Sequence, residues 1–263
     1  MPAISVLMSV YNGEKFLAES VRGILSQTFK DFEFVIVNDG STDQTSELLS
    51  ELVIADSRIK LIKNSQNLGL TRSLNSGLRQ CTGKYIARMD ADDVSAPNRF
   101  VKQFEYMENN PQTVLCGALG WYINEAGDRV GEKNLPTAYG DIKKKLLFNN
   151  QFIHSSLFIQ RDILEREGGY SEDFKTSQDY ELILRLADKY SVVNLPDRLI
   201  NWRVRHGSLS WSDKRQEWDA IRARWRGITK YNFSIWQGMG NMVLRLIWLA
   251  IPQKIKLIRH LFI

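Results

Sequence analysis

Three carboxylates lie within four residues in the segment Asp90-Ala91-Asp92-Asp93. At neutral pH they repel one another, and a hard divalent cation, Mg²⁺ or Mn²⁺, would neutralise them because such ions prefer oxygen ligands. A divalent cation in turn suits a polyphosphate substrate. The same acids would also suit the start of a helix near Pro97, because carboxylates are stabilised by the positive end of the helix dipole. This segment alone leaves a metal site and a helix start both open.

Polar residues also follow three earlier apolar runs, in the segments Tyr11-Asn12-Gly13-Glu14, 38–43 and 64–69. An open parallel sheet binds ligands beyond the carboxyl ends of its strands. Four polar strand ends in succession therefore favour a nucleotide-binding site. The first of them lacks the Gly-x-Gly-x-x-Gly pattern of dinucleotide sites, and the chain has no Walker A sequence, so these two kinds of site are excluded.

A sheet is needed to position these segments, and the hydrophobic pattern predicts one. Short apolar runs that predict strands occur at 4–10, 33–37, 59–63 and 84–89. Amphipathic segments that predict crossover helices lie between them, at 14–27, 42–52 and 70–80. Later elements are expected as a helix from Ala96-Pro97 to Asn110-Pro111, strands at 114–123 and 152–160 around a turn at 127–128, and a helix at 178–189. The pattern indicates an α/β fold with a mostly parallel sheet.

The composition is that of a globular protein, because 43% of the 263 residues are hydrophobic and 25% are charged. From Arg203 onward, 12 basic residues stand against three acidic ones, so a mildly acidic body precedes a basic tail. We predict an α/β domain over residues 1–210 and a basic, aromatic-rich helical appendage over 211–263. Cys81 and Cys116 have no metal-ligand spacing and are interpreted as buried small hydrophobic residues.

The chain starts without the basic and small-residue pattern of a signal peptide. It also has no run of about 18 uncharged apolar residues, the length that a membrane-spanning helix needs. We therefore expect a cytoplasmic protein that does not span a membrane.

A series of motifs along residues 3–210 resembles the family 2 inverting glycosyltransferases of bacterial surface-polysaccharide assembly. The motifs are MSVYNGEKFL, VIVNDGSTDQT, NLGLTRSLNSG, YIARMDADD, HSSLFI, SQDYELILRLA and RVRHGSLS. The resemblance implies a GT-A fold, which is a Rossmann-like, mostly parallel sheet flanked by helices. It further implies a nucleotide-diphospho-sugar donor, usually UDP-linked, and a Mg²⁺ or Mn²⁺ ion.

The resemblance also implies roles for residues at the nucleotide and metal sites. Those matching nucleotide-binding positions are Tyr11, Asn12, Glu14, Asp39 and Asp90. Tyr11, Asn12 and Glu14 would line the base, and Asp39 would accept a hydrogen bond from it. Asp90 and Asp92 match the Asp-x-Asp pair, in which the second carboxylate is the metal ligand, and Asp93 is a weaker candidate. His206 matches a position near the diphosphate that ligates the metal in some relatives.

On the acceptor side, Asp179 matches the family's general base. Gln178 precedes it where a glutamate is common, which makes Gln178 an acceptor-side candidate and puts the acceptor contact in doubt. His154 lies in an apolar segment expected to be a strand, where a lone histidine is more often a packed residue than a catalyst, and it too is kept as an acceptor-side candidate. In an inverting transfer, Asp179 would take the acceptor hydroxyl's proton while the metal at Asp92 offsets the charge of the leaving diphosphate.

The implied reaction moves a sugar to a hydroxyl of a lipid-linked or growing glycan acceptor. The alternative is a catalytically silent nucleotide-sugar-binding or membrane scaffold, because Gln178 departs from the usual pattern and the tail suits a membrane surface. A nucleotidyltransferase is disfavoured, since no glycine-rich basic turn follows the first strand.

The tail interleaves basic and aromatic residues. Within 241–263, isoleucines and Phe262 recur every three or four residues, Lys254, Lys256 and Arg259 lie off this stripe, and Pro252 would start or kink a helix. A basic amphipathic helix suits the anionic inner face of the cell membrane. Docking on the core, or a subunit interface in a homo-oligomer, is the open alternative. Nucleic-acid binding is disfavoured because no recognition motif accompanies the charge.

Overall fold

The computed structural model describes residues 1–204 and 214–250. Its first half alternates strands and helices, in the order β1 (Ile4–Val10), α1 (Leu17–Leu25), β2 (Phe32–Asn38), α2 (Thr45–Ala55), β3 (Ile59–Lys63), α3 (Leu70–Leu78) and β4 (Tyr85–Arg88). These four strands match the predicted ones to within one residue at each end. Their continuous apolar runs arise because helices cover both faces of the sheet, as parallel strands require.

The second half is more irregular than the first. It contains β5 (Val94–Ser95), α4 (Arg99–Asn109), β6 (Thr113–Ile123), β7 (Arg129–Lys133), α5 (Tyr139–Leu146), the 3₁₀ helix η1 (His154–Ser156), β8 (Phe158–Gln160), α6 (Arg161–Arg166), α7 (Gln178–Lys189) and β9 (Ser191–Arg203). The helices α9 (Lys214–Lys230) and α10 (Ile235–Ala250) follow. The helix α4 begins at Arg99, two residues after Pro97, and the short strand β5 ends two residues before that proline.

The strand predicted over 152–160 is wrong for most of its length. Only Phe158–Gln160 pair in the sheet, while His154–Ser156 form a 3₁₀ turn. Side-chain bonds fix this turn, since the Ser156 hydroxyl donates to the Ile153 carbonyl at 2.7 Å and accepts from the Ala118 amide at 3.1 Å. The segment is apolar because it is buried, and a short buried run cannot be distinguished from a strand by its composition.

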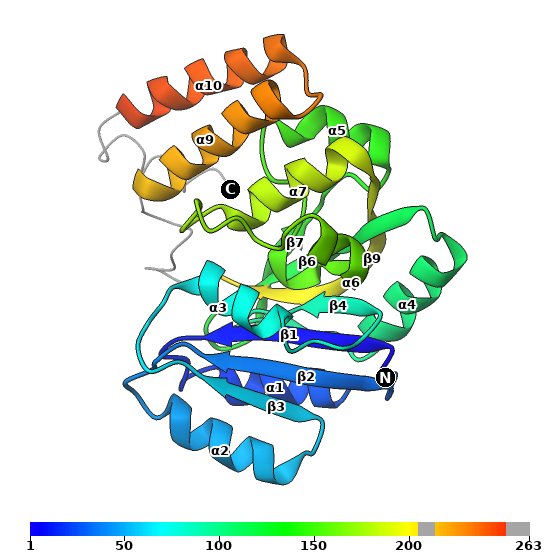
Figure 1. Ribbon diagram of the computed structural model, residues 1–263, viewed down its shortest axis with the longest axis vertical. Coiled ribbons are helices and arrows are strands. Elements are labelled where there is room, and N and C mark those ends of the chain that lie inside the picture. Colours follow the sequence, from blue (N-terminus) through cyan, green and yellow to red (C-terminus); the bar gives the residue numbers. More distant parts are fainter. Residues whose placement is uncertain (205–213, 251–263) are drawn as a thin grey trace.

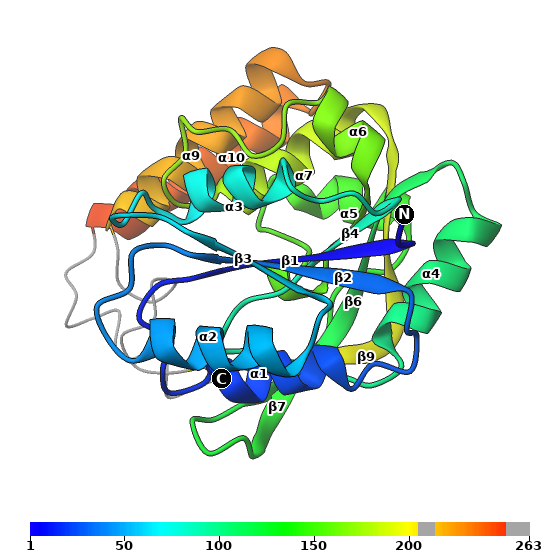
Figure 2. The same ribbon diagram turned by 60° about the horizontal axis from the view of Figure 1, so that its bottom comes forward.

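Within the described residues the strands form one sheet of nine, in the order β3-β2-β1-β4-β8-β6-β9-β5, with β7 paired to β6. The part β3-β2-β1-β4 is parallel. The strand β8 then pairs antiparallel with both β4 and β6, and β6 pairs parallel with β9. Figure 1 shows the sheet at the centre, and Figure 2 shows α1 and α2 on one face and α3 and α7 on the other. The carboxyl ends of β1 to β4 therefore share one edge.

Two hydrophobic clusters fill the spaces on the two faces of the sheet. Val6 and Met8 of β1 face the α1 side, whereas Leu7 faces the α3 and α7 side, as the alternation of a strand dictates. The cluster on the α3 and α7 side also contains Ala223 of α9 and Phe233 before α10. The helix α9 thus shares the core of the sheet domain. The predicted boundary at residue 210 lies outside the described residues.

Candidate active site

The loop after β1 is joined to the loop after β2 by its own polar side chains. The Asn12 Oδ1 atom accepts from the Thr42 amide at 2.9 Å, and the Asn12 amide donates to the Ser41 hydroxyl at 3.0 Å. Glu14 Oε2 accepts from the Gln44 amide at 3.0 Å, at the start of α2. Asn12 has a left-handed backbone with a φ of 52°, which asparagine tolerates better than most residues. Two of the predicted nucleotide-binding side chains therefore also hold these loops together.

Tyr11 is the third residue that was predicted to line the base. It presents an exposed ring at the same edge of the sheet, with 48% of its surface accessible. An exposed aromatic ring held beside an ordered polar loop is suited to stacking against a planar base. Its contact with a base stays a prediction.

Asp39 is buried at the end of β2, with only 2% of its surface exposed. Its carboxylate accepts from Asn64 Nδ2 at 2.8 Å and from the amides of Leu68 and Gly69, both at 2.9 Å. The neighbouring Gly40 has a φ of 69°, and a Cβ there would collide with the backbone of Gln66. Asp39 and Gly40 therefore bring the 64–69 loop against the end of β2. The structural use of Asp39 was missed from the sequence because its partners lie 25 or more positions away.

Asp90 lies in a network of three side chains beyond β4. Arg88 donates to Asp90 Oδ1, and the Ser155 hydroxyl of η1 donates to Asp90 Oδ2 at 2.7 Å. Burial acts to raise the pKa of Asp90, but the positive charge of Arg88 and the bond from Ser155 outweigh it and lower the pKa to about 2. Asp90 is thus an anion at neutral pH. The motif HSS was visible in the sequence, but only its histidine was singled out there.

Asp93 is almost fully buried and has a different environment from Asp90. It contacts the Ser155 hydroxyl through Oδ2, and its Oδ1 accepts from the Arg203 amide at 2.8 Å. Burial and the charges of Asp92 and Asp90 raise its pKa well above the usual range. A protonated Asp93 can donate to Ser155, whose single hydroxyl proton then goes to Asp90. Asp93 therefore serves to connect β9 with the acidic segment.

Arg203, at the end of β9, holds the acidic segment from the other side. Its buried guanidinium donates from Nε to the Asp92 carbonyl at 2.8 Å and from Nη2 to Glu19 Oε2 at 2.6 Å. It also donates from Nη1 to the carbonyls of Asn124 and Glu125, at 2.9 and 3.0 Å. This residue was missed from the sequence, although it begins the motif RVRHGSLS, because nothing local marks its many distant partners.

Asp92 is half-buried beside this arginine. A carboxylate is a fitting ligand for Mg²⁺ or Mn²⁺, because such sites commonly use one or two carboxylates and complete the shell with substrate phosphates. Within the described residues no group of three or more His, Cys, Asp or Glu side chains forms a metal site. His206, the other predicted ligand, lies outside the described residues.

Asp179 is the second residue of α7 and is half-buried, so that it can reach solvent. Its Oδ2 atom accepts from Asn150 Nδ2 at 2.8 Å. Burial raises the pKa of Asp179, and the negative charge of Asp90 raises it further. The fold therefore brings Asp179 within electrostatic range of Asp90, although the two lie far apart in the sequence. The adjacent Gln178 is only 4% exposed, so Asp179 is the more accessible of the two side chains.

His154 lies in η1, with Nε2 at 3.2 Å from the Tyr170 hydroxyl and Nδ1 at 3.9 Å from Asp90 Oδ2. Burial and the nearby charge of Arg88 lower the pKa of His154 to about 3, so the ring is neutral at physiological pH. Burial also raises the pKa of Tyr170, which therefore keeps its proton and can exchange a hydrogen bond with the neutral ring.

The profile of the Glycosyl transferase family 2 matches residues 5–168, which is more than half of the chain. The chain belongs to this family. The amylovoran biosynthesis glycosyltransferase AmsE of Erwinia amylovora is 35% identical to this family 2 chain over 223 residues, which cover 83% of the chain and 82% of AmsE. Relatives named for polysaccharide biosynthesis thus share most of its length.

Solved structures resemble the family 2 chain in fold. S. aureus TarS in complex with UDP-GlcNAc has a TM-score of 0.73 and 17% identity, over 92% of this chain and 71% of that one. The mannosyltransferase PcManGT of Pyrobaculum calidifontis, in complex with GDP-Man and Mn²⁺, has a TM-score of 0.70 and 17% identity, over 92% and 68%. The fold is therefore of the GT-A type, as predicted, and the family 2 chain is a glycosyltransferase. Among its described residues, every helix is too short or too polar to cross a membrane.

Proposed function

We propose that the protein is a metal-dependent inverting glycosyltransferase that uses a nucleotide-diphospho-sugar, in particular a UDP-sugar. The observation that carries this proposal is the position of Asp179. It is a partly exposed carboxylate at the start of α7, it is oriented by Asn150 at 2.8 Å, and burial and the negative charge of Asp90 raise its pKa. Inversion by direct displacement requires a base for the acceptor hydroxyl, and Asp179 would be that base. Metal dependence requires carboxylates near the donor diphosphate, and the segment 90–93 would supply them.

The donor would lie along the edge formed by the ends of β1, β2 and β4. The exposed Tyr11 ring is suited to the base, and the ordered loops 11–14 and 38–43 provide amide and carboxylate partners. Asp90, an anion at neutral pH, can accept from a ribose or sugar hydroxyl. The solved relatives with UDP-GlcNAc and GDP-Man support a nucleotide-sugar donor of this kind.

In the proposed reaction, Asp179 takes the proton of the acceptor hydroxyl as the oxygen attacks the anomeric carbon. A raised pKa makes this carboxylate a stronger base than an ordinary aspartate. Asn150 donates to its Oδ2 and so orients the carboxylate for the acceptor. A Mg²⁺ or Mn²⁺ ion bound by Asp92, together with His206, would offset the negative charge of the diphosphate.

The acceptor is proposed to be a hydroxyl of a lipid-linked or growing glycan, since AmsE is named for the biosynthesis of the polysaccharide amylovoran. His154 and Gln178 remain acceptor-side candidates. Association with an anionic membrane surface is supported by the exposed apolar side chains of the last two helices, which are Trp218, Trp225, Ile235, Trp236, Met239 and Val243. Most side chains of the amphipathic helix predicted over 241–263 are outside the part of the chain that the structure describes.

A donor screen tests the proposal. The full chain is incubated with a panel of UDP- and GDP-sugars, a set of glycan and lipid-linked acceptors, and Mn²⁺ or EDTA, and release of the nucleotide is measured. We expect release that depends on acceptor and metal, a β product from an α donor, and a fall of roughly a hundredfold in Asp179→Asn. The exposed Asp162 of α6 provides the matched control, Asp162→Asn, which should keep full activity. Donor binding without turnover across the panel would instead favour a scaffold.

A further inference from the structure

The residue two positions before Asp179 has an unusual backbone. Ser177 has a φ of 54° and a ψ of 22°, a left-handed conformation that is unfavourable for a residue with a Cβ. Such conformations persist where the surroundings enforce them, and they gather at functional sites. The question is therefore which contacts hold Ser177 and so aim the first turn of α7.

The contacts come from α9, far along the chain. The amide and the hydroxyl of Thr176 both donate to Asp219 Oδ2, at 3.1 and 2.9 Å. The Ser177 hydroxyl donates to the Gln216 carbonyl at 3.2 Å. Asp219 is only 5% exposed, and Arg222 Nη1 donates to its other oxygen at 2.9 Å. A buried carboxylate of α9 thus holds Thr176, and a backbone carbonyl of the same helix holds Ser177, the last two residues before α7.

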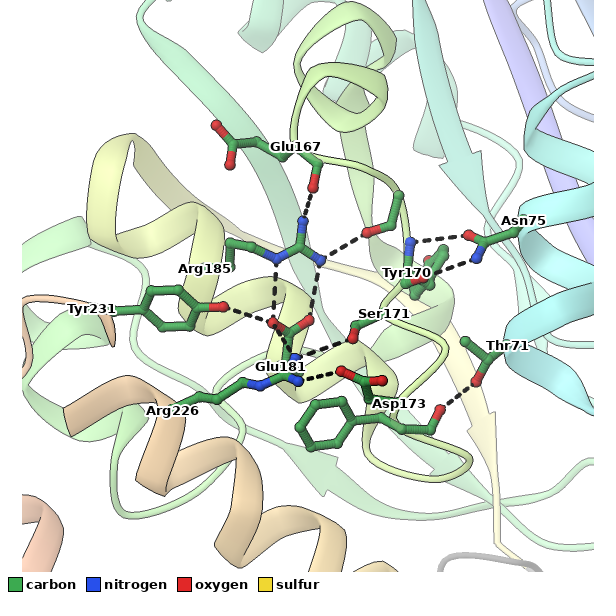
Figure 3. Close-up of polar contacts among 12 residues, drawn as sticks. Thr71, Asn75, Glu167, Tyr170, Ser171, Asp173, Glu181, Arg185, Arg226 and Tyr231 are labelled. Atoms are coloured by element: carbon green, nitrogen blue, oxygen red, sulfur yellow. Dashed lines mark hydrogen bonds and ion pairs between the residues drawn. The ribbon is translucent and has the colours of Figure 1, made fainter. Parts of the chain in front are cut away.

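The same helix also holds the earlier part of this loop, as Figure 3 shows. Arg226 donates to the Ser171 hydroxyl at 3.1 Å and pairs with Asp173. Arg226 also lies 3.7 Å from Glu181, a buried carboxylate in the first turn of α7 that pairs with Arg185 at 3.0 Å. Charged groups of α7 and α9 therefore line the loop 171–177 on one side.

On its other side, the loop is bonded to α3. Asn75 and the backbone of Tyr170 exchange two hydrogen bonds, at 2.8 and 3.0 Å, and the Thr71 hydroxyl donates to the Phe174 carbonyl at 2.7 Å (Figure 3). Tyr170 in turn contacts His154 in the site. The loop is thus anchored on both sides, and it connects α9 to the candidate catalytic centre.

We infer that Asp219 is a positioning residue for Asp179, so that α9 is part of the catalytic apparatus. This inference rests on the proposed role of Asp179 as the base. Through Thr176, which is bonded to Ser177 in the chain, Asp219 sets the direction in which α7 begins and hence where the Asp179 carboxylate points. The helix α9 lies beyond residues 5–168, the part that matches the family profile. The basic appendage predicted from residue 211 therefore contributes to catalysis through its first helix.

The test compares Asp219→Ala, Asp219→Asn and Thr176→Val in the full chain. In Asp219→Ala, kcat should fall by roughly 10- to 100-fold, a loss expected from a small misplacement of a catalytic group, while the donor KM and UDP binding stay within about twofold. Asp219→Asn should recover most of kcat, because its amide oxygen can still accept both bonds from Thr176. Thr176→Val, which removes one of those bonds, should give an intermediate kcat. Thr229→Ala on α9 is the control, since that exposed hydroxyl bonds only within its own helix.

Two results would overturn the inference. One is an unchanged kcat in Asp219→Ala and Thr176→Val at a temperature where circular dichroism shows both to be folded. The other is a parallel loss of donor affinity and kcat without recovery in Asp219→Asn, which would indicate a general structural role. Asp179→Asn, measured alongside, separates the two proposals. If Asp179→Asn stays active, the proposed role of Asp179 is wrong. If Asp179→Asn is inactive while the Asp219 and Thr176 variants stay active, only the proposed role of Asp219 is wrong.

Discussion

Asn150 and Asp179 are joined by a hydrogen bond of 2.8 Å between the side-chain amide and the carboxylate, although they lie 29 positions apart. The amide donates, so it stabilises the charged form of Asp179 against the burial that raises its pKa. The contact orients the candidate base, and it acts in the same direction as the backbone amides of Tyr180 and Asp179 and the charge of Arg88, which limit how far the pKa of Asp179 rises.

A change at Asn150 should therefore alter the pH dependence of turnover. Asp179 acts as a base only when deprotonated, so activity is lost as the pH falls through its pKa. Without the amide, in Asn150→Ala, the pKa should rise further and the acidic limb of the kcat profile should move to higher pH. The exposed neighbour provides the control, and Asn149→Ala should keep the wild-type limb. If the acidic limb of the kcat profile of Asn150→Ala lies at the wild-type pH, the contact does not influence the pKa of Asp179.

Asp92 and Asp93 should respond differently to the same substitution. Asp92→Asn should lose the Mn²⁺ dependence of UDP binding in calorimetry, because an amide keeps the shape of the carboxylate but lacks its charge. Asp93→Asn should keep it, since asparagine can still accept from the Arg203 amide and donate to Ser155. Equal loss in both variants would mean that Asp92 has no special role as a ligand.

Arg203 should be a major source of stability. Arg203→Ala removes one donor from each of the carbonyls of Asp92, Asn124 and Glu125 as well as the ion pair with Glu19, and we expect a loss of about 3 to 5 kcal/mol in the free energy of unfolding. Urea denaturation measures this value. Arg22→Ala, at an exposed arginine of α1, should change it by less than about 0.5 kcal/mol. Similar values for both variants would show that the contacts of Arg203 are dispensable.

Glu33 should make stability depend on pH in the acidic range. Burial acts to raise its pKa, but Lys60 and the bonds from Ser5 and Thr82 lower it from 4.5 to about 2. Its contribution is thus complete above pH 4.5 and is lost as the pH falls to about 2. In Glu33→Gln, the slope of unfolding free energy between these two pH values should become shallower. An unchanged slope would assign the acid sensitivity to other carboxylates.

The exposed apolar side chains of α9 and α10 provide a test of membrane association. Full-length protein should sediment with vesicles that contain anionic lipid, and salt should weaken the binding because each basic residue near the surface contributes about 1 kcal/mol. Trp236 has 85% of its surface exposed, so Trp236→Ser should weaken binding without unfolding the chain. Binding to neutral vesicles only, or none at all, would contradict the proposed anionic surface.

The local pattern of the chain was sufficient for the parallel half of the sheet. The strands from Ile4–Val10 to Tyr85–Arg88 are apolar runs between amphipathic helices, and this alternation places their polar ends together at one edge. The carboxylates of the segment 90–93 left a metal site and a helix start both open, and the four polar strand ends together favoured a nucleotide site. The roles of Asp90, Asp92 and Asp179 came from the family resemblance and stay predictions.

Only the tertiary structure decided the contacts between segments that are distant in the sequence. Ser155 joins Asp90 to Asp93 over more than 60 positions, Arg203 reaches back to Glu19, and Asp219 holds the loop before Asp179. Hydrophobic periodicity marks none of these residues, because the place of a single buried polar side chain depends on which groups it contacts in the folded chain. Side-chain hydrogen bonding also made His154–Ser156 a 3₁₀ turn where burial had suggested a strand. Periodicity records which face of an element is buried, whereas the pairing of buried polar groups depends on how the whole chain packs.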